Sequence, residues 1–388
     1  MKIIPYGKQY IDGEDIKAVS KALRNDLITT GSEVKKFEEL FSKKVGSRYA
    51  VTCSNATAGL LLAYIALGIK KSEIIVMPAI NFIASINMAH FIKAKIYLTD
   101  VDPKTGRMRP EDLLDCIKKN KLKKINTLIV MHHGGLPCDM KKFKSIQKKY
   151  KFNIIEDACH ALGAKYSLKD EKVGSCKYSS LSIFSFHPVK NITTGEGGII
   201  TTNNKKLYEK LKILRNHGIL RKKSSRKNYN WSYKIVTPGF NFRLNDFQCA
   251  LGISQLKKLD KFISFRQSIA KQYINIFSSY KDLIDFPDIR EIKLSAFHLF
   301  ILNLNLKKIN QTRNQIIKKL FQKGIITQVH YIPIFCYPFY KNFFDKKFFH
   351  NAETYFKSCL SIPIFYGMKQ KEIKHVSNTF KKIIKSNN

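Results

Sequence analysis

A regular alternation of short apolar runs with helix-like segments is the feature that most constrains the fold. The runs hold four to seven residues each and are rich in β-branched side chains. They are Tyr49–Thr52, Ile74–Met77, Lys95–Leu98, Thr127–Met131, Phe152–Ile155, Ser180–Phe186 and Ile199–Thr202. Short buried strands separated by helices are typical of a mainly parallel sheet covered by helices on both faces. The sequence therefore predicts an α/β fold, preceded by helices over Glu14–Leu27 and Ser32–Lys44.

The 388 residues are enough for two domains. A long helical pattern starts at Asp246, with Asn245 as its predicted N-cap. Beyond about residue 260 helices and short strands mix without regular alternation. We therefore predict a large domain over residues 1–255, which includes the N-terminal helical segment, and a small C-terminal domain over residues 256–388. In open α/β sheets ligands bind outside the carboxyl ends of the strands, so functional residues are expected there.

The chain is strongly basic, with 69 lysines and arginines against 29 acidic residues and a net charge of +40. Such an excess is common in proteins that bind nucleic acid. Here the lysines are spread over the whole chain among many isoleucines and asparagines, which indicates a bias in composition. No basic patch interleaved with aromatic residues offers a stacking platform for bases. We expect no nucleic-acid partner, although the charge should attract small anionic ligands.

Several other classes of protein are disfavoured. No stretch approaches the ~20 consecutive apolar residues of a membrane helix, and the first residues lack the features of a signal peptide. We therefore expect a cytoplasmic protein without membrane contact. The eight cysteines are scattered without a Cys-x-x-Cys pair, which suits reduced thiols. No His-Glu-x-x-His or Gly-x-Ser-x-Gly motif occurs, so neither a metal site nor a serine hydrolase is expected.

Two predicted strand ends carry suggestive groups. The segment Ser54–Gly59 places small hydroxylic residues at the start of an apolar helix, where free N–H groups and the helix dipole bind phosphate. Taken alone, a capped helix without a ligand is the more common explanation. The acids Glu156 and Asp157 end another apolar run, where burial without partners is costly. A carboxylate there can pair with a protonated ring nitrogen, and His160 can support the same group.

A third strand end, Ser182–Gly198, is the most informative. Lys190 follows the strand in a tight, partly apolar loop, where a depressed pKa would let its amine attack an aldehyde and form a Schiff base. The Gly-Glu-Gly-Gly sequence at Gly195–Gly198 leads into a strand and is therefore not a dinucleotide fingerprint. Its glycines fit a turn that lets the backbone approach a cofactor closely.

These segments resemble the sugar-nucleotide aminotransferases of the aspartate-aminotransferase superfamily (fold type I), over essentially the whole chain. The matching stretches are Leu27–Gly31, Ser54–Gly59, Glu156–Gly163, Ser185–Gly198, Asn216–Gly218 and Gly239–Asn245. The resemblance implies a three-layer large domain with a mainly parallel sheet and a smaller α+β C-terminal domain. It also implies pyridoxal 5'-phosphate as the cofactor.

The resemblance assigns roles in cofactor binding. Lys190 would bind the cofactor covalently and shuttle the proton, while Asp157 would keep the pyridinium nitrogen protonated. His160 would lie beside that acid, and Phe82 would stack on the ring. The phosphate would be bound by Ala56, Thr57 and Ser185, joined by Asn241 from a neighbouring subunit. That last role implies a homodimer with shared active sites.

The resemblance also implies the substrates. Ser185–Gly198 and Gln328–Ile334 resemble most closely the pseudaminic-acid branch of the family. This implies amino transfer from L-glutamate to the C-4 ketone of a UDP-linked 4-keto-6-deoxy-N-acetyl-hexose. The residues that match sugar-nucleotide positions are Tyr6, Asp26, Leu27, Ile28, Thr29, His187, Gln328, Val329, His330 and Tyr331.

Alternatives stay open at this point. The His-His-Gly-Gly sequence at His132–Gly135 replaces the usual single aromatic-Gly pattern, a departure that concerns the substrate pocket and not the cofactor site. A second hypothesis keeps the cofactor chemistry but takes a legionaminic-acid precursor or a dTDP-keto hexose as the substrate. Some relatives carry histidine in place of the lysine and are sugar dehydratases, whereas Lys190 favours transamination. A basic, nucleic-acid-associated protein without catalysis is the alternative from another class. The polar stretch Leu220–Ser232 is predicted to be a mobile surface loop near the partner's active site.

Overall fold

A seven-stranded sheet forms the centre of the computed structural model, which describes residues 3–169, 171–220 and 231–385. Its strand order is β1-β7-β6-β5-β4-β2-β3. The strands are β1 (Tyr49–Cys53), β2 (Ile74–Pro78), β3 (Lys95–Thr99), β4 (Thr127–Met131), β5 (Asn153–Asp157), β6 (Leu181–Ser185) and β7 (Gly198–Thr202). Strands β2 to β6 pair in parallel, and β7 runs antiparallel to its two neighbours. The predicted mainly parallel sheet is confirmed.

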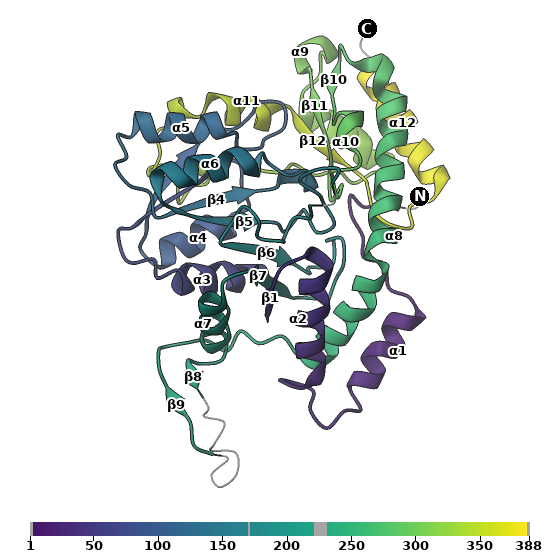
Figure 1. Cartoon of the computed structure of the whole chain (residues 1–388). Coiled ribbons are helices and arrows are strands. Elements are labelled where there is room, and N and C mark those ends of the chain that lie inside the picture. Colours follow the sequence, from purple (N-terminus) through teal and green to yellow (C-terminus); the bar gives the residue numbers. More distant parts are fainter. Residues whose placement is uncertain (1–2, 170, 221–230, 386–388) are drawn as a thin grey trace.

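Helices cover both faces of this sheet (Figure 1). One face carries α5 (Pro110–Lys119) and α6 (Met140–Tyr150), and the other carries α3 (Ala56–Ala66), α4 (Ala84–Phe91) and α7 (Lys205–Arg215). Alternate strand residues pack against opposite layers. Ile129 and Ile155 belong to the cluster beside α3 and α4, whereas Leu128 and Ile154 pack with α5 and α6. Because side chains alternate along a strand, burial of both faces makes each strand apolar throughout.

Two N-terminal helices, α1 (Gly13–Ala22) and α2 (Ser32–Val45), pack along α8 (Asp246–Phe277) (Figure 1). Asn245 is the N-cap of α8, as predicted. Helix α1 ends at Ala22, before the predicted end at Leu27. The reason is tertiary, because the carbonyl of Ile28 accepts the N–H of Asp246 at 2.9 Å and this segment is drawn away from a helical path.

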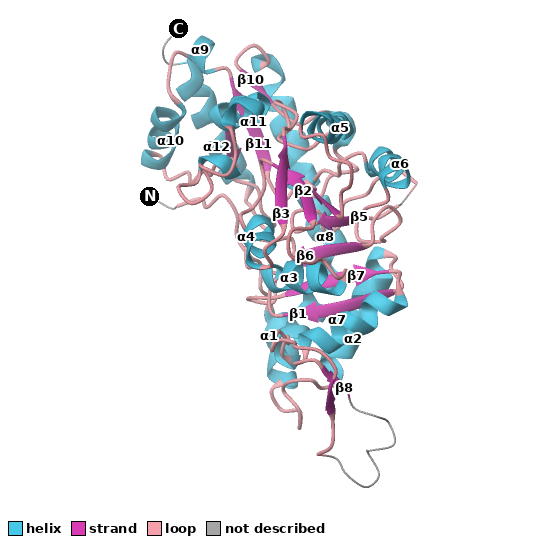
Figure 2. Cartoon of the chain, turned by 90° about the vertical axis from the view of Figure 1, so that its left-hand side faces the viewer, coloured by secondary structure: helices cyan, strands magenta, loops and turns pink. Residues whose placement is uncertain are grey.

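A second, antiparallel sheet lies in the C-terminal part of the chain (Figure 2). Its strands are β10 (Ile284–Asp285), β11 (Phe300–Leu304) and β12 (Cys359–Ile362), accompanied by α9 (Leu306–Ile309), α10 (Arg313–Gln322), α11 (His350–Ser358) and α12 (Gln370–Lys385). A separate hydrophobic cluster joins this sheet to α10, α12 and the second half of α8. The predicted boundary between residues 255 and 256 falls inside α8 and stays a prediction.

The predicted loop Leu220–Ser232 follows β8 (Ile219–Leu220), which pairs with β9 (Lys234–Ile235). Residues 221–230 of that loop lie outside the described residues. Within the described ranges, no helix is long and apolar enough to cross a membrane.

Candidate functional site

A cavity of about 710 Å³ lies at the carboxyl ends of β4, β5 and β6, where the sequence predicts a ligand. Its walls come from the loops after these strands, the first turn of α3 and a segment of the C-terminal part. The predicted site residues that line it are Tyr6, Ala56, Thr57, Phe82, Asp157, His160, Ser185, His187, Lys190, His330 and Tyr331. The fold thus brings together groups from both ends of the chain.

The other predicted site residues do not line this cavity. Asp26, Leu27, Ile28 and Thr29 form an exposed segment between α1 and α2. Asn241 is exposed as well. Gln328 pairs through its backbone with Ser361, and Val329 packs against the core beneath the large sheet. Their assigned roles stay predictions.

The first turn of α3 offers donors for an anion. The side chain of Asn55 caps this helix by accepting the N–H of Ala58 at 2.8 Å. The N–H groups of the first helical residues lack partners within the helix, and here those residues, Ala56 and Thr57, line the cavity. Gly198 makes room for this arrangement, because a Cβ there would lie 2.7 Å from the carbonyl carbon of Asn55. The sequence predicted that the glycines of the Gly-Glu-Gly-Gly turn let the backbone approach a cofactor, whereas Gly198 lets the start of β7 approach the start of α3.

Lys190 and Asp157 place an amine and a carboxylate at the cavity. Lys190 ends a turn in which its N–H donates to the carbonyl of His187 at 2.9 Å. Burial lowers the pKa of Lys190, against the opposing influence of Cys159 and Asp157. Asp157 is 3% exposed, and its Oδ1 accepts the N–H of Cys159 at 3.2 Å. The contact of its Oδ2 with Ser85 Oγ is long, at 3.5 Å, so this oxygen has capacity for a further donor.

Histidines form one wall of the cavity. The rings of His160 and His298 lie 4.4 Å apart between centroids, and His160 Nε2 contacts the hydroxyl of Tyr331 at 3.0 Å. Burial lowers the pKa of both histidines well below the ordinary value, and the charge of Lys190 lowers it further. Both imidazoles are therefore uncharged at neutral pH.

His298 was missed by the sequence analysis. It is a single histidine among apolar residues just before β11, a pattern that gives no local signal of function. It reaches the cavity because the backbone around it pairs with a turn after β4. Ala296 N–H donates to the carbonyl of Gly135 at 2.9 Å, and Leu299 N–H donates to that of Gly134 at 3.1 Å.

The unusual His-His-Gly-Gly sequence has a structural reason at its last position. A Cβ on Gly135 would lie 2.7 Å from the carbonyl oxygen of His160 and 3.0 Å from the backbone nitrogen of His298. Only a residue without a side chain allows these three backbone segments to meet. Gly135 therefore lets the turn after β4 approach the segment that carries His298.

The cavity fits pyridoxal phosphate. The start of α3 offers N–H groups for the phosphate, Asp157 lines the cavity with a carboxylate that has capacity for a ring N–H, and Lys190 offers an amine for the aldehyde. Phe82, half-exposed at the cavity, offers an aromatic face. In the part of the chain that the structure describes, no group of three or more His, Cys, Asp or Glu side chains is arranged to hold a metal ion.

Comparisons with known proteins agree with this chemistry. Residues 9–381 match the model of the DegT/DnrJ/EryC1/StrS aminotransferase family. The chain is 37% identical to the UDP-4-amino-4,6-dideoxy-N-acetyl-beta-L-altrosamine transaminase of Campylobacter jejuni, with 98% of each chain covered. It is 36% identical to the uncharacterized protein MJ1066 of Methanocaldococcus jannaschii, over 99% of this chain and 98% of that one.

A solved structure extends the similarity to the fold. Helicobacter pylori PseC, an aminotransferase involved in the biosynthesis of pseudoaminic acid, superposes with a TM-score of 0.91 at 28% identity, over 99% of this chain and 100% of that one. The predicted fold type I architecture, the cofactor and the class of enzyme are thereby confirmed. The chain belongs to the DegT/DnrJ/EryC1/StrS family and is a pyridoxal-phosphate-dependent sugar-nucleotide aminotransferase.

Proposed function

We propose that this aminotransferase moves the amino group of L-glutamate to the C-4 ketone of a UDP-linked 4-keto-6-deoxy-N-acetyl-hexose, in pseudaminic-acid biosynthesis. One observation carries the proposal. Tyr6, His187, His330 and Tyr331, which match sugar-nucleotide positions of the pseudaminic-acid branch, line the same cavity as Lys190. The 37% identity to the Campylobacter jejuni transaminase over 98% of both chains supports it.

The residues of the cavity would have distinct roles in this reaction. Pyridoxal phosphate supplies, when bound, an electron sink for the carbon that loses a proton. The first turn of α3 would hold its phosphate, and Asp157 Oδ2 would accept the N–H of its ring. Lys190 Nζ, whose pKa is lowered by burial, would take the proton from the substrate carbon and return it.

Tyr331 is suited to bind a sugar oxygen. The N–H of Gly134 points at His160 Nδ1 at 3.4 Å, so we place the ring proton on Nε2, where it is donated to the oxygen of Tyr331 at 3.0 Å. The hydroxyl proton of Tyr331 then remains for a ligand. Burial also raises the pKa of Tyr331 well above its ordinary value, which keeps that proton in place.

The visible absorption spectrum of the purified protein tests the chemistry. We expect a yellow band that fades when L-glutamate is added, because the amino group passes from the donor to the cofactor. Lys190→Ala should lose the covalently bound chromophore and turnover. A Lys190→Ala variant with substantial remaining activity would contradict the assignment of Lys190.

The sugar is tested by comparing substrates. The value of kcat/KM should be higher for the UDP-linked 4-keto-6-deoxy-N-acetyl-hexose of the pseudaminic-acid series than for a legionaminic-acid precursor or a dTDP-keto hexose. The reverse order would transfer the proposal to the other sugar and leave the aminotransferase assignment intact.

We further propose a homodimer in which Asn241 completes the partner's phosphate site. In support, Asn241 and the apolar residues Leu27 and Ile28 are exposed in the single chain. Refolding a mixture of Lys190→Ala and Asn241→Ala chains should restore roughly a quarter of wild-type activity, because half of the dimers would be mixed and each would hold one intact site. No recovery above the two single variants would contradict the shared site.

A further inference from the structure

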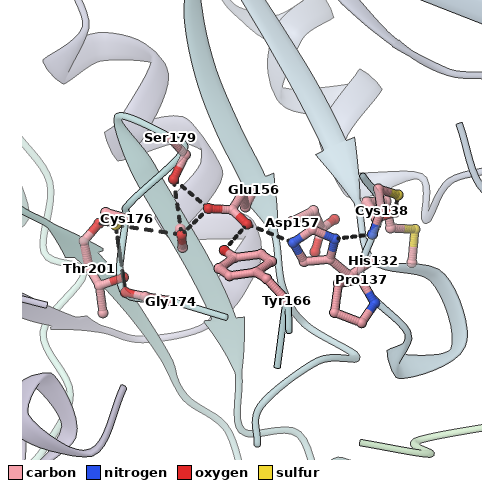
Figure 3. A network of polar contacts seen from close by, with 12 residues as sticks. His132, Pro137, Cys138, Glu156, Asp157, Tyr166, Gly174, Cys176, Ser179 and Thr201 are labelled. Carbon is pink, nitrogen blue, oxygen red and sulfur yellow. Dashed lines mark hydrogen bonds and ion pairs between the residues drawn. The ribbon is translucent and has the colours of Figure 1, made fainter. Parts of the chain in front are cut away.

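A network of buried polar side chains lies behind the active site, at the end of β5 (Figure 3). Glu156 and Asp157 are consecutive in this strand, so their side chains point to opposite faces of the sheet. Asp157 lines the cavity, whereas Glu156 is 0% exposed and is not among the lining residues. The proposed function gives Glu156 no task.

Four donors satisfy the carboxylate of Glu156, two on each oxygen. Oε1 accepts from Ser179 Oγ at 2.5 Å and from Ser182 Oγ at 2.9 Å. Oε2 accepts from the Tyr166 hydroxyl and from His132 Nε2, the latter at 2.7 Å. Burial raises the pKa of Glu156, but hydrogen bonds from His132, Ser179 and Tyr166 more than offset it, so the group is a carboxylate at neutral pH.

His132 connects this network to Asp157. Its backbone N–H donates to the carbonyl oxygen of Asp157 at 3.1 Å, while its side chain donates to Glu156. The N–H of Cys138 points at His132 Nδ1 at 3.2 Å, which places a ring proton on Nε2, toward Glu156. The end of β5 is therefore held on both sides of Asp157 Cα, at the Glu156 side chain and at the Asp157 carbonyl.

Stability alone gives little reason for such a network. Replacing a buried ionic group and its partners by well-packed apolar side chains is often neutral or stabilising. The neighbouring strand residues Ile154 and Ile155 show that this sheet accepts apolar side chains on both faces. By contrast, hydrogen bonds with fixed directions hold a backbone in one position, and the carboxylate of Asp157 has few such bonds of its own.

We propose that Glu156 is a positioning residue for the cofactor and, with His132, fixes the end of β5 so that Asp157 meets the ring nitrogen of pyridoxal phosphate. The role is comparable to that of residues that hydrogen-bond to metal ligands and orient them. Loss of such residues typically lowers the affinity for the metal about 10-fold to 100-fold. If Glu156 acts through Asp157, its loss should weaken binding only of a ligand whose ring carries a nitrogen that Asp157 can bind.

The test compares two ligands on the apoprotein. Pyridoxal phosphate offers a ring nitrogen, and its 1-deaza analogue has carbon at that position and cannot bond to Asp157. Glu156→Gln keeps the shape of the side chain, and the serine and tyrosine hydroxyls can turn to accept from the new amide. We expect it to lower the affinity for pyridoxal phosphate about tenfold while leaving the affinity for the analogue nearly unchanged.

A matched pair of variants supports the test. Tyr166→Phe removes one donor to Glu156 and, like Glu156→Gln, should reduce the preference for pyridoxal phosphate over the analogue. Tyr273→Phe removes a buried hydroxyl bonded to the Pro363 carbonyl at 2.9 Å, far from the network in sequence, and should leave that preference unchanged.

Equilibrium dialysis of each apoprotein against both ligands measures the preference. An equal loss of affinity for the two ligands, or an unchanged preference in Glu156→Gln, would overturn the proposal, because the network would then support only the fold. If Glu156→Gln does not fold, the comparison of Tyr166→Phe with Tyr273→Phe decides in the same way.

Discussion

Replacing Gly135 by alanine should separate the segment that carries His298 from the active site. The new Cβ would lie 2.7 Å from the His160 carbonyl oxygen, 3.0 Å from the His298 nitrogen and 3.1 Å from the Phe297 nitrogen. All three are backbone atoms, so no side-chain rotation relieves the contacts. The residue also has a φ of +103°, where an L side chain costs about 1–2 kcal/mol. Overpacking typically adds about 1–3 kcal/mol, so we expect the free energy of unfolding to fall by about 2–5 kcal/mol.

Gly134→Ala is the matched control. Gly134 has a φ of +70°, but the nearest atom to its new Cβ is Ile301 Cδ1 at 3.4 Å, the mobile end of a side chain. The free energy of unfolding of Gly134→Ala should therefore fall only by the cost of the added backbone strain, about 1–2 kcal/mol. Urea unfolding followed by circular dichroism measures both losses, and steady-state kinetics should show a higher KM for the sugar nucleotide in Gly135→Ala. Equal losses of stability in the two variants, with equal kinetics, would refute the close approach as the reason for Gly135.

Further predictions concern the cofactor site and the core. Burial lowers the pKa of Lys190 below 10.5, so its amine loses the proton at a lower pH. The rate at which the apoprotein captures pyridoxal phosphate should therefore reach half its maximum below pH 10.5. A midpoint at or above that value would contradict the shift. Asn55→Ala removes the cap of α3, which should cost about 1 kcal/mol of stability and weaken binding of pyridoxal phosphate but not of pyridoxal; an equal effect on both ligands would speak against phosphate binding there. Arg266, 2% exposed, donates to the carbonyls of Ile364 at 2.8 Å and Phe297 at 3.2 Å, so Arg266→Met should lower the free energy of unfolding by about 2–4 kcal/mol. An unchanged urea midpoint would show that these bonds contribute nothing.

Groups with local signals were accessible from the sequence. Asp157 ends β5, while Lys190 and the start of α3 come shortly after β6 and β1, and parallel strands end at the same edge of a sheet. Knowing the strands therefore placed these groups in one cavity before any distance was known. The resemblance to a family supplied their roles, which neither composition nor spacing contains.

Residues whose positions depend on contacts with distant segments could not be placed from the sequence in this way. His298 reaches the cavity because its neighbours Ala296 and Leu299 form backbone hydrogen bonds to Gly135 and Gly134. These glycines lie more than one hundred and fifty positions earlier in the chain. Glu156 and Asp157 are adjacent acids in the sequence, and the alternation of side chains along β5 places Asp157 at the cavity and Glu156 in the buried network.

The sequence by itself determined the order of strands and helices along the chain, the apolar character of both sheet faces and the position of Lys190 after a strand end, because these depend on neighbours along the chain. Only the tertiary structure decided where α1 ends, that Glu156 lies in a buried network behind the cavity, and that His298 lines the cavity with Lys190. Those features depend on hydrogen bonds and close approaches between segments far apart in the chain, and a linear pattern does not record such contacts.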